Sequence, residues 1–351
     1  MPSMKEIASH TGPCLLLALE SSCDETAASV IKDGLTPLSN VVSSQIRIHK
    51  EFGGIVPEIA SRHHLKALLL VVDTAIRDAG IGLFDVEGLA VTQGPGLVGS
   101  LVVTWSFSKA LAAVLGIPMA GVNHLHAHLL SVFLEPDPPG FPYVGLVVSG
   151  GHTSLFLVRD HLSIKPLGRT RDDAAGEAFD KVATVLGLEY PGGPVVSRLS
   201  EEGDPGAISL PRPRLPDTPL DFSFSGLKTA VISVLRKAPR PLSDRFVADL
   251  CASFEEAVTD VLTEKTIHAA QMHGVRVVCV TGGVAANRRL REKMGAACLH
   301  AGLKVHFPTP FICTDNAAMV GIAGFHLIRA GRTVTPEDDV YSRAANREMG
   351  W

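Results

Sequence analysis

The sequence predicts an α/β fold built from two copies of one α/β unit. Two pairs of similar segments support this: strand–turn–strand patterns at 15–31 and 143–158, and strands that run into a Gly-rich turn at 88–96 and 275–283. The 351 residues are 46% hydrophobic and 5% aromatic, with 33 Gly and 23 Pro, which suits an α/β protein with many tight turns. In such a duplication the two Gly-rich hairpin turns face each other across a cleft that can hold a nucleotide.

The first unit starts with a hairpin. Residues 15–31 indicate a strand, a small polar turn and a second strand, and residues 32–34 (Lys-Asp-Gly) close the pattern with a hairpin turn. Residues 99–122 are almost wholly apolar, but Lys109 lies in the middle and a Gly-Ile-Pro sequence at 116–118 interrupts them. We therefore expect a buried helix followed by a strand, rather than a membrane span.

The second unit repeats the hairpin at 143–158, and residues 159–160 (Arg-Asp) close it. Residues 174–186 then place apolar side chains at helical spacing, so we expect a helix with one buried face. The strand within 275–283 leads into a helix that opens near Ala286.

The chain divides at residues 135–140, a Pro-rich linker. We expect an N-terminal tail over 1–13, a first lobe over 14–134 and a second lobe over 141–314. A C-terminal helix over 315–345 is expected to pack back on the first lobe.

The charge and the cysteines limit the class of protein. The formal net charge is −4, whereas a dedicated nucleic-acid binder is usually strongly basic, so contact with RNA must use a local patch or a partner's surface. The six cysteines lack the close spacing of a zinc ribbon or redox motif, which favours reduced thiols in a cytoplasm. The apolar run at 14–19 is too short for a signal-peptide core. We expect a cytoplasmic protein that is not bound to a membrane.

Two histidines, His124 and His128, stand four residues apart, and Asn123 before them is a suitable N-cap for a helix. They then share one helix face and can chelate a metal, with Asp315 in the first turn of a later helix as third ligand. Such a set suits ferrous iron or zinc. The alternative is that the histidines are ordinary packed or solvated residues and that Asp315 only complements its helix dipole. Leu125 stands where a zincin protease has glutamate, which argues against a peptidase.

Two Gly-rich turns are candidates for a nucleotide-binding site. Residues 149–153 and 281–287 each allow a backbone turn to approach a ligand closely, and Asn287 can bond an adenine or a ribose. Asp180 lies opposite the apolar stripe of its helix, where it can accept from a ribose hydroxyl, and the turn at 190–194 can pass under the same sugar. Ordinary hairpin turns and a solvated carboxylate are the alternative.

Asp24 and Glu25 lie in the polar turn of the first hairpin. A carboxylate pair in this position can orient an incoming nucleophile or take its proton. The alternative is a turn whose Ser and Asp side chains bond their own backbone.

Together these segments resemble the TsaD family of tRNA N6-adenosine threonylcarbamoyltransferases, formerly called glycoproteases. Each segment is weak alone, but their ordered set extends over nearly the whole chain and is very specific. The matching segments are 20–26, 53–62, 93–97, 124–128, 149–152, 176–180, 190–193, 224–229, 281–283 with Asn287, and 314–316.

The resemblance implies a fold and a reaction. The fold is two ribonuclease-H-like lobes of the actin, sugar-kinase and heat-shock ATPase superfamily around a nucleotide cleft. The reaction transfers the threonylcarbamoyl group of threonylcarbamoyl-AMP to the exocyclic amine of the adenosine next to the anticodon, in tRNAs that read codons beginning with A, and releases AMP.

The resemblance also assigns residues. The family's metal ligands fall on His124, His128 and Asp315, with Fe²⁺ favoured over Zn²⁺. Asp24 or Glu25 would help to remove the proton of the attacking amine. The adenylate site falls on Val147, Val148, Ser149, Gly150, Gly151, Asp180, Gly193 and Asn287.

Two positions separate the branches of the family. Archaeal and eukaryotic cytosolic members carry a Tyr ligand where this chain has Val147 and an Asn where it has His152, so this chain resembles the bacterial or organellar branch. The partners implied are tRNA, threonylcarbamoyl-AMP, a non-catalytic TsaB-like paralogue and a small TsaE-like ATPase. Three other functions stay open: a peptidase, a kinase or chaperone-like ATPase, and a non-catalytic scaffold.

Overall fold

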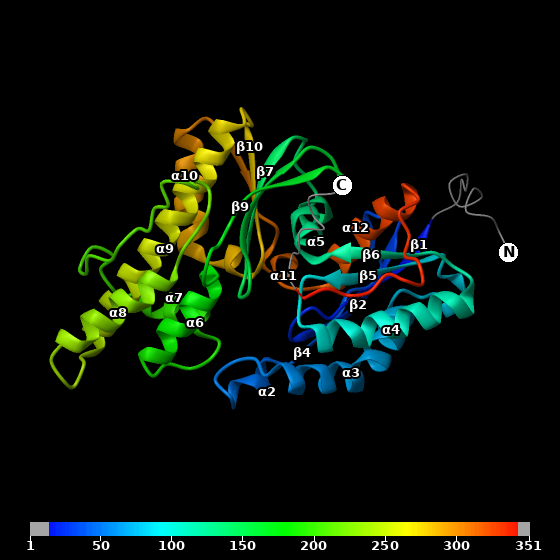
Figure 1. The fold of residues 1–351 in the computed structure, drawn as a ribbon, viewed down its shortest axis with the longest axis horizontal. Helices are drawn as coiled ribbons and strands as arrows, with labels where there is room; N and C mark the ends of the chain where they lie inside the picture. Colours follow the sequence, from blue (N-terminus) through cyan, green and yellow to red (C-terminus); the bar gives the residue numbers. More distant parts are fainter. Residues whose placement is uncertain (1–13, 343–351) are drawn as a thin grey trace.

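A computed structural model of the chain describes residues 14–342, and its elements form two lobes, each built around one sheet (Figure 1). The tail expected over 1–13 lies outside the described residues. The chain passes from the first lobe to the second between residues 134 and 143, where the linker was expected.

The first sheet has the strand order β3-β2-β1-β5-β6, with β4 beside β2. Strand β1 is antiparallel to β2 and parallel to β5, which is parallel to β6. The strands are β1 (Leu15–Glu20), β2 (Glu25–Lys32), β3 (Thr36–Pro37), β4 (Val41–Ser44), β5 (Gly88–Gly94) and β6 (Met119–Asn123).

The second sheet has the order β11-β10-β7-β8-β9. Strand β7 is antiparallel to β8 and parallel to β10, which is parallel to β11. Position by position this is the topology of the first sheet, so the predicted duplication is confirmed. The strands are β7 (Tyr143–Val148), β8 (Thr153–Val158), β9 (Ile164–Arg169), β10 (Val277–Thr281) and β11 (Lys304–His306).

Helices cover both faces of the first sheet because its central strands bury side chains on both sides. Leu17 and Leu19 of β1 pack with α3 and α4, whereas Ala18 between them packs with α12. Small residues on the α12 side allow a close approach: an added Cβ at Gly324 would overlap Ala90 of β5. The helices are α2 (Ile46–Lys50), α3 (Pro57–Asp78), α4 (Val98–Leu115), α5 (His124–Leu130) and α12 (Ala317–Arg329), with short 3₁₀ turns η1 (Leu83–Asp85) and η2 (Ser131–Leu134).

Helix α12 packs against the first sheet, but the helix expected over 315–345 is shorter than predicted. It begins at Ala317 because the side chain of Asn316 accepts from the N–H of Met319 and caps it. It ends at Arg329, and Gly331 follows in the left-handed region at φ 72°. Asp315 therefore precedes the helix instead of lying in its first turn, and positions 343–345 lie outside the described residues.

The second lobe is organised around the long helix α9 (Asp244–Met272), which contacts β7 and β10 and packs against α7 and α10. Its inward side chains, among them Phe254 and Leu262, are fully buried. The other helices are α6 (Ala175–Val185), α7 (Gly192–Ser200), α8 (Ser225–Lys237), α10 (Arg288–His300) and α11 (Pro310–Cys313), with the 3₁₀ turn η3 (Gly283–Ala286) before α10.

The apolar segment 99–122 forms α4 followed by β6, the order that the sequence predicts. Helix α4 is long and apolar enough to cross a membrane by length and composition alone. In the structure 28% of its 18 residues are buried. Leu101 and Trp105 are buried, whereas Val114 is 81% exposed. The expectation of a buried helix therefore holds for one face of α4 only.

Candidate metal and nucleotide site

The two predicted histidine ligands share one face of α5. The side-chain oxygen of Asn123 accepts from the N–H groups of Leu125 and His126, so the predicted N-cap is confirmed. One turn of helix separates His124 from His128, and their ring centroids lie 4.7 Å apart. Helix α5 contacts β7 and β10 of the second lobe and α12 of the first, which places both histidines at the boundary between the lobes.

Asp315 lies against both histidines, although it follows His128 by 187 residues. Its Oδ1 is 3.0 Å from Nε2 of His128 and 3.8 Å from Nε2 of His124. One ligand atom from each of the three residues lies within 4.8 Å of the others. Two imidazoles and one carboxylate at this spacing fit a divalent transition metal. In the described structure Nδ1 of His128 is buried without a hydrogen-bond partner.

Glu20 completes this cluster, and the sequence interpretation assigned it no role. The carboxylate at the end of β1 is fully buried, and its Oε2 lies 3.0 Å from Nδ1 of His124. The hydroxyl of Thr92 and the N–H of Ser22 also donate to it, at 2.7 and 2.5 Å. A carboxylate on Nδ1 fixes the ring orientation and leaves Nε2 for a metal. An ionisable residue directly after a run of apolar strand residues was the signal that could have revealed it.

The charges of the cluster stabilise one another. Burial by itself would lower the pKa of His124, but the carboxylates of Glu20 and Asp315 outweigh it and raise the pKa to about 9. Burial would likewise raise the pKa of Asp315, but the neighbouring His124 and His128 hold it below its ordinary value. Without a metal, His124 therefore carries a proton at neutral pH, and a metal has to displace that proton.

His152 lies beside the cluster, with its ring centroid 6.0 Å from that of His124. Burial and the nearby imidazoles of His124 and His128 lower the pKa of His152 to about 3, so its ring is neutral at physiological pH. Val147 is fully buried and packs in the same apolar cluster as Leu125, so it offers no side-chain ligand.

The predicted adenylate residues of the first Gly-rich turn lie next to the second turn. Gly282 has a φ of 93°, and an added Cβ there would overlap the carbonyl group of Val148. The carbonyl oxygens of Ser149 and Gly150 accept from the first N–H groups of α6. The space in the direction of a side chain is open at Gly150 and Gly151, where an added Cβ would meet nothing within 4 Å. The side chain of Val148 is fully buried, so only its backbone can face a ligand.

Asp180 connects α6 to the start of α7. Its Oδ1 accepts from the N–H of Gly192 at 2.7 Å, and Gly193 beside it faces open space. Burial raises the pKa of Asp180, with these backbone hydrogen bonds opposing and the charges of Glu177 and Asp24 adding to the rise. The structure thus brings Asp180 and Gly193 together.

Asn287 lies at the end of η3, where its side chain is already engaged. Its Oδ1 accepts from the N–H of Leu290 and caps α10, and its Nδ2 is 2.6 Å from both Ser197 Oγ and Glu255 Oε1. Helix α10 therefore opens at Arg288, two residues after the predicted start. Neither Ser197 nor Glu255 was a sequence candidate, since nothing in the local pattern distinguishes them from other helix residues.

Asp24 lies in the turn between β1 and β2, as predicted, whereas Glu25 is the first residue of β2 and not part of the turn. Burial, reinforced by the charges of Asp24 and Asp315, raises the pKa of Glu25 well above its ordinary value. Glu25 also accepts a hydrogen bond from the hydroxyl of Ser44 at 3.0 Å. Because Asp24 acts on the pKa of Asp180 as well, this turn lies within electrostatic reach of both the histidine cluster and the second lobe.

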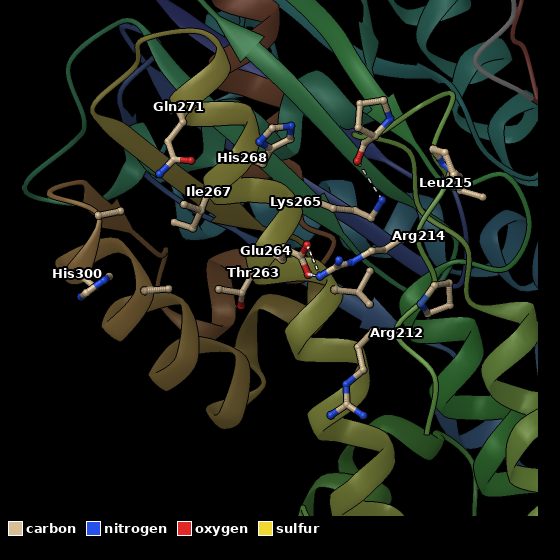
Figure 2. Close-up of a pocket in the computed structure, with 16 residues that line it drawn as sticks. Arg212, Arg214, Leu215, Thr263, Glu264, Lys265, Ile267, His268, Gln271 and His300 are labelled. Carbon is tan, nitrogen blue, oxygen red and sulfur yellow. Dashed lines mark hydrogen bonds and ion pairs between the residues drawn. The ribbon is translucent and has the colours of Figure 1, made fainter. Parts of the chain in front are cut away.

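A separate cavity of about 850 Å³ lies between the loop 212–219 and helices α9 and α10 (Figure 2). Arg214 on its wall is paired with Glu264, and Lys265 donates to the carbonyl oxygen of Pro219 at 3.0 Å. None of the predicted site residues lines it. The cavity is therefore distinct from the predicted adenylate site.

Two lobes of this topology, with a His/His/Asp cluster at their boundary, define a protein of the actin-like two-lobed class with a site suited to a metal. The family model described as tRNA N6-adenosine threonylcarbamoyltransferase, TsaD, matches residues 36–322. The chain belongs to this family.

Curated relatives agree with this membership over nearly their full length. A tRNA N6-adenosine threonylcarbamoyltransferase of Geotalea uraniireducens is 54% identical over 88% of this chain and 90% of its own. The protein of that name from Syntrophotalea carbinolica is 49% identical over 96% of this chain and 98% of its own.

Solved structures with low sequence identity share the fold. HypF of T. kodakarensis has a TM-score of 0.62 at 15% identity, over 91% of this chain and 48% of that one. Component A of the Acidaminococcus fermentans (R)-2-hydroxyglutaryl-CoA dehydratase has a TM-score of 0.51 at 16% identity, over 90% and 99%. These likenesses confirm the predicted fold class of two actin-like lobes.

Proposed function

We propose that this chain transfers the threonylcarbamoyl group of threonylcarbamoyl-AMP to the exocyclic amine of an adenosine in tRNA. The acceptor is the adenosine next to the anticodon, in tRNAs that read codons beginning with A, and AMP is released. The match of the family model over residues 36–322 carries this proposal. The His/His/Asp cluster at the lobe boundary and the hydrogen bond from Gly192 to Asp180 in the second lobe support it.

The chemistry makes specific demands on the protein. The amine nitrogen forms a bond to the carbamoyl carbon, the bond from that carbon to the phosphate oxygen breaks, and the amine loses one proton. An aromatic amine is a poor nucleophile, so holding it next to the carbamoyl carbon supplies much of the rate. Asp24 or Glu25 takes the proton in this proposal; burial and the charges of Asp24 and Asp315 raise the pKa of Glu25 and so increase its affinity for a proton.

A divalent metal, Fe²⁺ in preference to Zn²⁺, is part of the proposal. His124, His128 and Asp315 would hold it, with Glu20 behind His124. When bound, the metal supplies Lewis acidity and a fixed point for oxygen atoms of the donor. The chain's own residues keep the ligand atoms in place, since His124 and His128 are buried and Asp315 is mostly buried.

The adenylate occupies the second lobe in this proposal. The turn at 147–151 and Gly193 present backbone groups, and Asp180 and Asn287 lie beside them. The open space next to Gly150, Gly151 and Gly193 supports this placement.

Partners complete the proposal. We place the protein in the cytoplasm, acting on tRNA together with a non-catalytic TsaB-like paralogue and a small TsaE-like ATPase. Leu65, Leu69 and Leu70 on the outer side of α3 are 69%, 67% and 67% exposed, and such a group of apolar side chains suits a protein partner. The formal charge of −4 is consistent with tRNA binding that is shared with partners.

A transfer assay tests the proposal. The purified chain is mixed with its partner subunits, radiolabelled threonine, bicarbonate, ATP and unmodified tRNA, and wild type is compared with His124→Ala. We expect label in the tRNA with wild type and a loss of at least about 100-fold with His124→Ala, because a metal ligand is removed. His126→Ala is the matched control on the same helix and is expected to retain transfer.

Other outcomes of the assay would favour one of the alternative functions or remove the role of the metal. Equal labelling by wild type and His124→Ala would leave the transferase and remove the proposed role of the metal. Absence of label with competent partners, together with rapid ATP turnover in the absence of tRNA, would favour the ATPase alternative. Cleavage of a peptide substrate would revive the peptidase alternative, against which Leu125 argues.

A further inference from the structure

Glu255 on α9 is a buried carboxylate without a cation. Its residue is 6% exposed, and among residues 14–342 neither Lys nor Arg forms a salt bridge with it. The next residue, Glu256, faces Arg289 and Lys293 and is paired with both. An uncompensated carboxylate is costly to bury, so hydrogen-bond donors must stabilise it.

Among the described residues, hydrogen bonds reach one oxygen of Glu255 only. Its Oε1 accepts from Ser197 Oγ and from Nδ2 of Asn287, the latter at 2.6 Å. In the described part of the chain no group donates a hydrogen bond to Oε2. This oxygen is not fully buried, in contrast to the buried side-chain atoms that lack a partner. An unused acceptor therefore remains open to a ligand or to solvent at an otherwise buried position.

This open oxygen lies among the residues that the adenylate proposal uses. Ser197 stands one turn after Gly193 on α7, whose first N–H is held by Asp180. Asn287 follows the turn in which Gly282 packs on the carbonyl group of Val148. Glu255 thus contacts both sides of the proposed adenylate site: Ser197 on α7 and Asn287 after η3.

We propose that Glu255 is a ligand-binding residue whose Oε2 accepts a hydrogen bond from a ribose hydroxyl of the bound adenylate. The proposal rests on the adenylate site in the second lobe. In a nucleotide the ribose follows the phosphate, and the Gly-rich turns with their open backbone positions are the part of the site suited to the phosphate. Ser197 lies one helical turn after Gly193 on α7 and donates to Glu255, so Glu255 lies beyond the Gly-rich positions, on the side where the ribose follows the phosphate in this proposal.

A hydroxyl is the donor that fits this position. A carboxylate oxygen can only accept, and hydrogen bonds to a charged acceptor are stronger than neutral ones. Ser197 and Asn287 already occupy Oε1, so they hold the carboxylate plane in one orientation and leave Oε2 pointing to one place. Glu255 then selects for ribose over deoxyribose.

The test compares nucleotides that lack single groups. Binding of AMP, 2′-deoxy-AMP, 3′-deoxy-AMP and IMP to the full-length chain is measured by calorimetry for wild type and Glu255→Gln. We expect wild type to bind one deoxy nucleotide about tenfold more weakly than AMP. In Glu255→Gln this difference shrinks to about threefold or less, because the amide nitrogen that replaces Oε2 cannot accept a hydrogen bond. Glu264→Gln, on the same helix but beside the separate cavity, keeps the full difference.

Other results would overturn the inference. If wild type binds both deoxy nucleotides as well as AMP, or if Glu255→Gln retains the full difference, Glu255 does not bind the ribose. A difference between AMP and IMP that depends on Glu255 would assign the carboxylate to the adenine amine instead. Failure of wild type to bind AMP at all would overturn the adenylate site itself, which is a distinguishable outcome.

A second variant and an unfolding measurement distinguish loss of the hydrogen bond from loss of the fold. Ser197→Ala removes one of the two donors that orient Oε1 but keeps the carboxylate and the Asn287 hydrogen bond, so it should reduce the deoxy difference less than Glu255→Gln does. Thermal unfolding of each variant without nucleotide identifies any loss of the fold.

Discussion

Glu20 is the residue on which the geometry of the histidine cluster depends. It is fully buried, and its oxygens are held by Thr92, Ser22 and His124. We expect Glu20→Gln to weaken metal binding by about 10- to 100-fold, because the amide is a poorer acceptor for His124 Nδ1–H and the ring loses its fixed orientation.

Competition with a chelator, for Zn²⁺ and for Fe²⁺ under anaerobic conditions, measures this change without an activity assay. Glu58→Gln removes a carboxylate that takes part only in an exposed pair within α3 and should bind metal like wild type. Equal metal affinity of Glu20→Gln and wild type would show that Glu20 does not act on His124.

At the scale of the element, α5 is a seven-residue helix that carries both histidine ligands. A helix of this length is not stable by itself, so its cap and its packing hold it. We expect Asn123→Ala to cost about 1 kcal/mol of folding free energy and also to weaken metal binding, because the start of the helix moves with its first ligand. Asn123→Ser keeps a capping oxygen and should restore most of both.

Another capped helix provides the control. Ser243 caps α9 by accepting from the N–H of Phe246, far along the chain from the histidines. Ser243→Ala should lose a similar free energy in urea unfolding but leave metal affinity unchanged. If the two cap variants affect metal binding equally, the loss reports general destabilisation and not the position of α5.

At the scale of the whole molecule, side chains from both lobes meet at the boundary. The ring of His326 on α12 stacks on that of His161, in the turn between β8 and β9, with centroids 3.6 Å apart. Lys50 on α2 reaches Glu189 of the second lobe at 2.6 Å, but both side chains are exposed and the pair contributes little. The histidine stack is therefore the more informative contact to test.

Burial, together with the nearby His161, lowers the pKa of His326 from 6.5 to about 4. Because the folded-state pKa lies below the unfolded value, the neutral ring stabilises the fold above pH 6.5, and this contribution is lost as the pH falls towards 4. We expect His326→Phe, which keeps the stack, to lose about 1 kcal/mol less stability than wild type between pH 7 and pH 5, after allowance for the partial exposure of the ring.

Urea unfolding at the two pH values measures this difference. A His326→Phe variant as sensitive to acid as wild type would show that the stack does not titrate between these pH values.

Local regularities in the sequence account for much of this molecule. Apolar alternation and turn residues predicted both hairpins, and the repeat of the pattern predicted two lobes of one topology. The spacing of His124 and His128 and the cap at Asn123 predicted two ligands on one helix face. These features depend on residues within a few positions of one another, where side-chain period and backbone hydrogen bonding act directly.

Tertiary packing decided the rest. Glu20 and Asp315 reach His124 and His128 across 104 and 187 residues, and no local period encodes those distances. The side chain of Asn287 was expected to bond a ligand, yet Ser197 and Glu255 hold its amide nitrogen. Local sequence patterns specify which elements form and which of them carry chemical groups. The sheet order and the lobe boundary specify which of those groups meet, because contacts between distant segments exist only after the elements have packed.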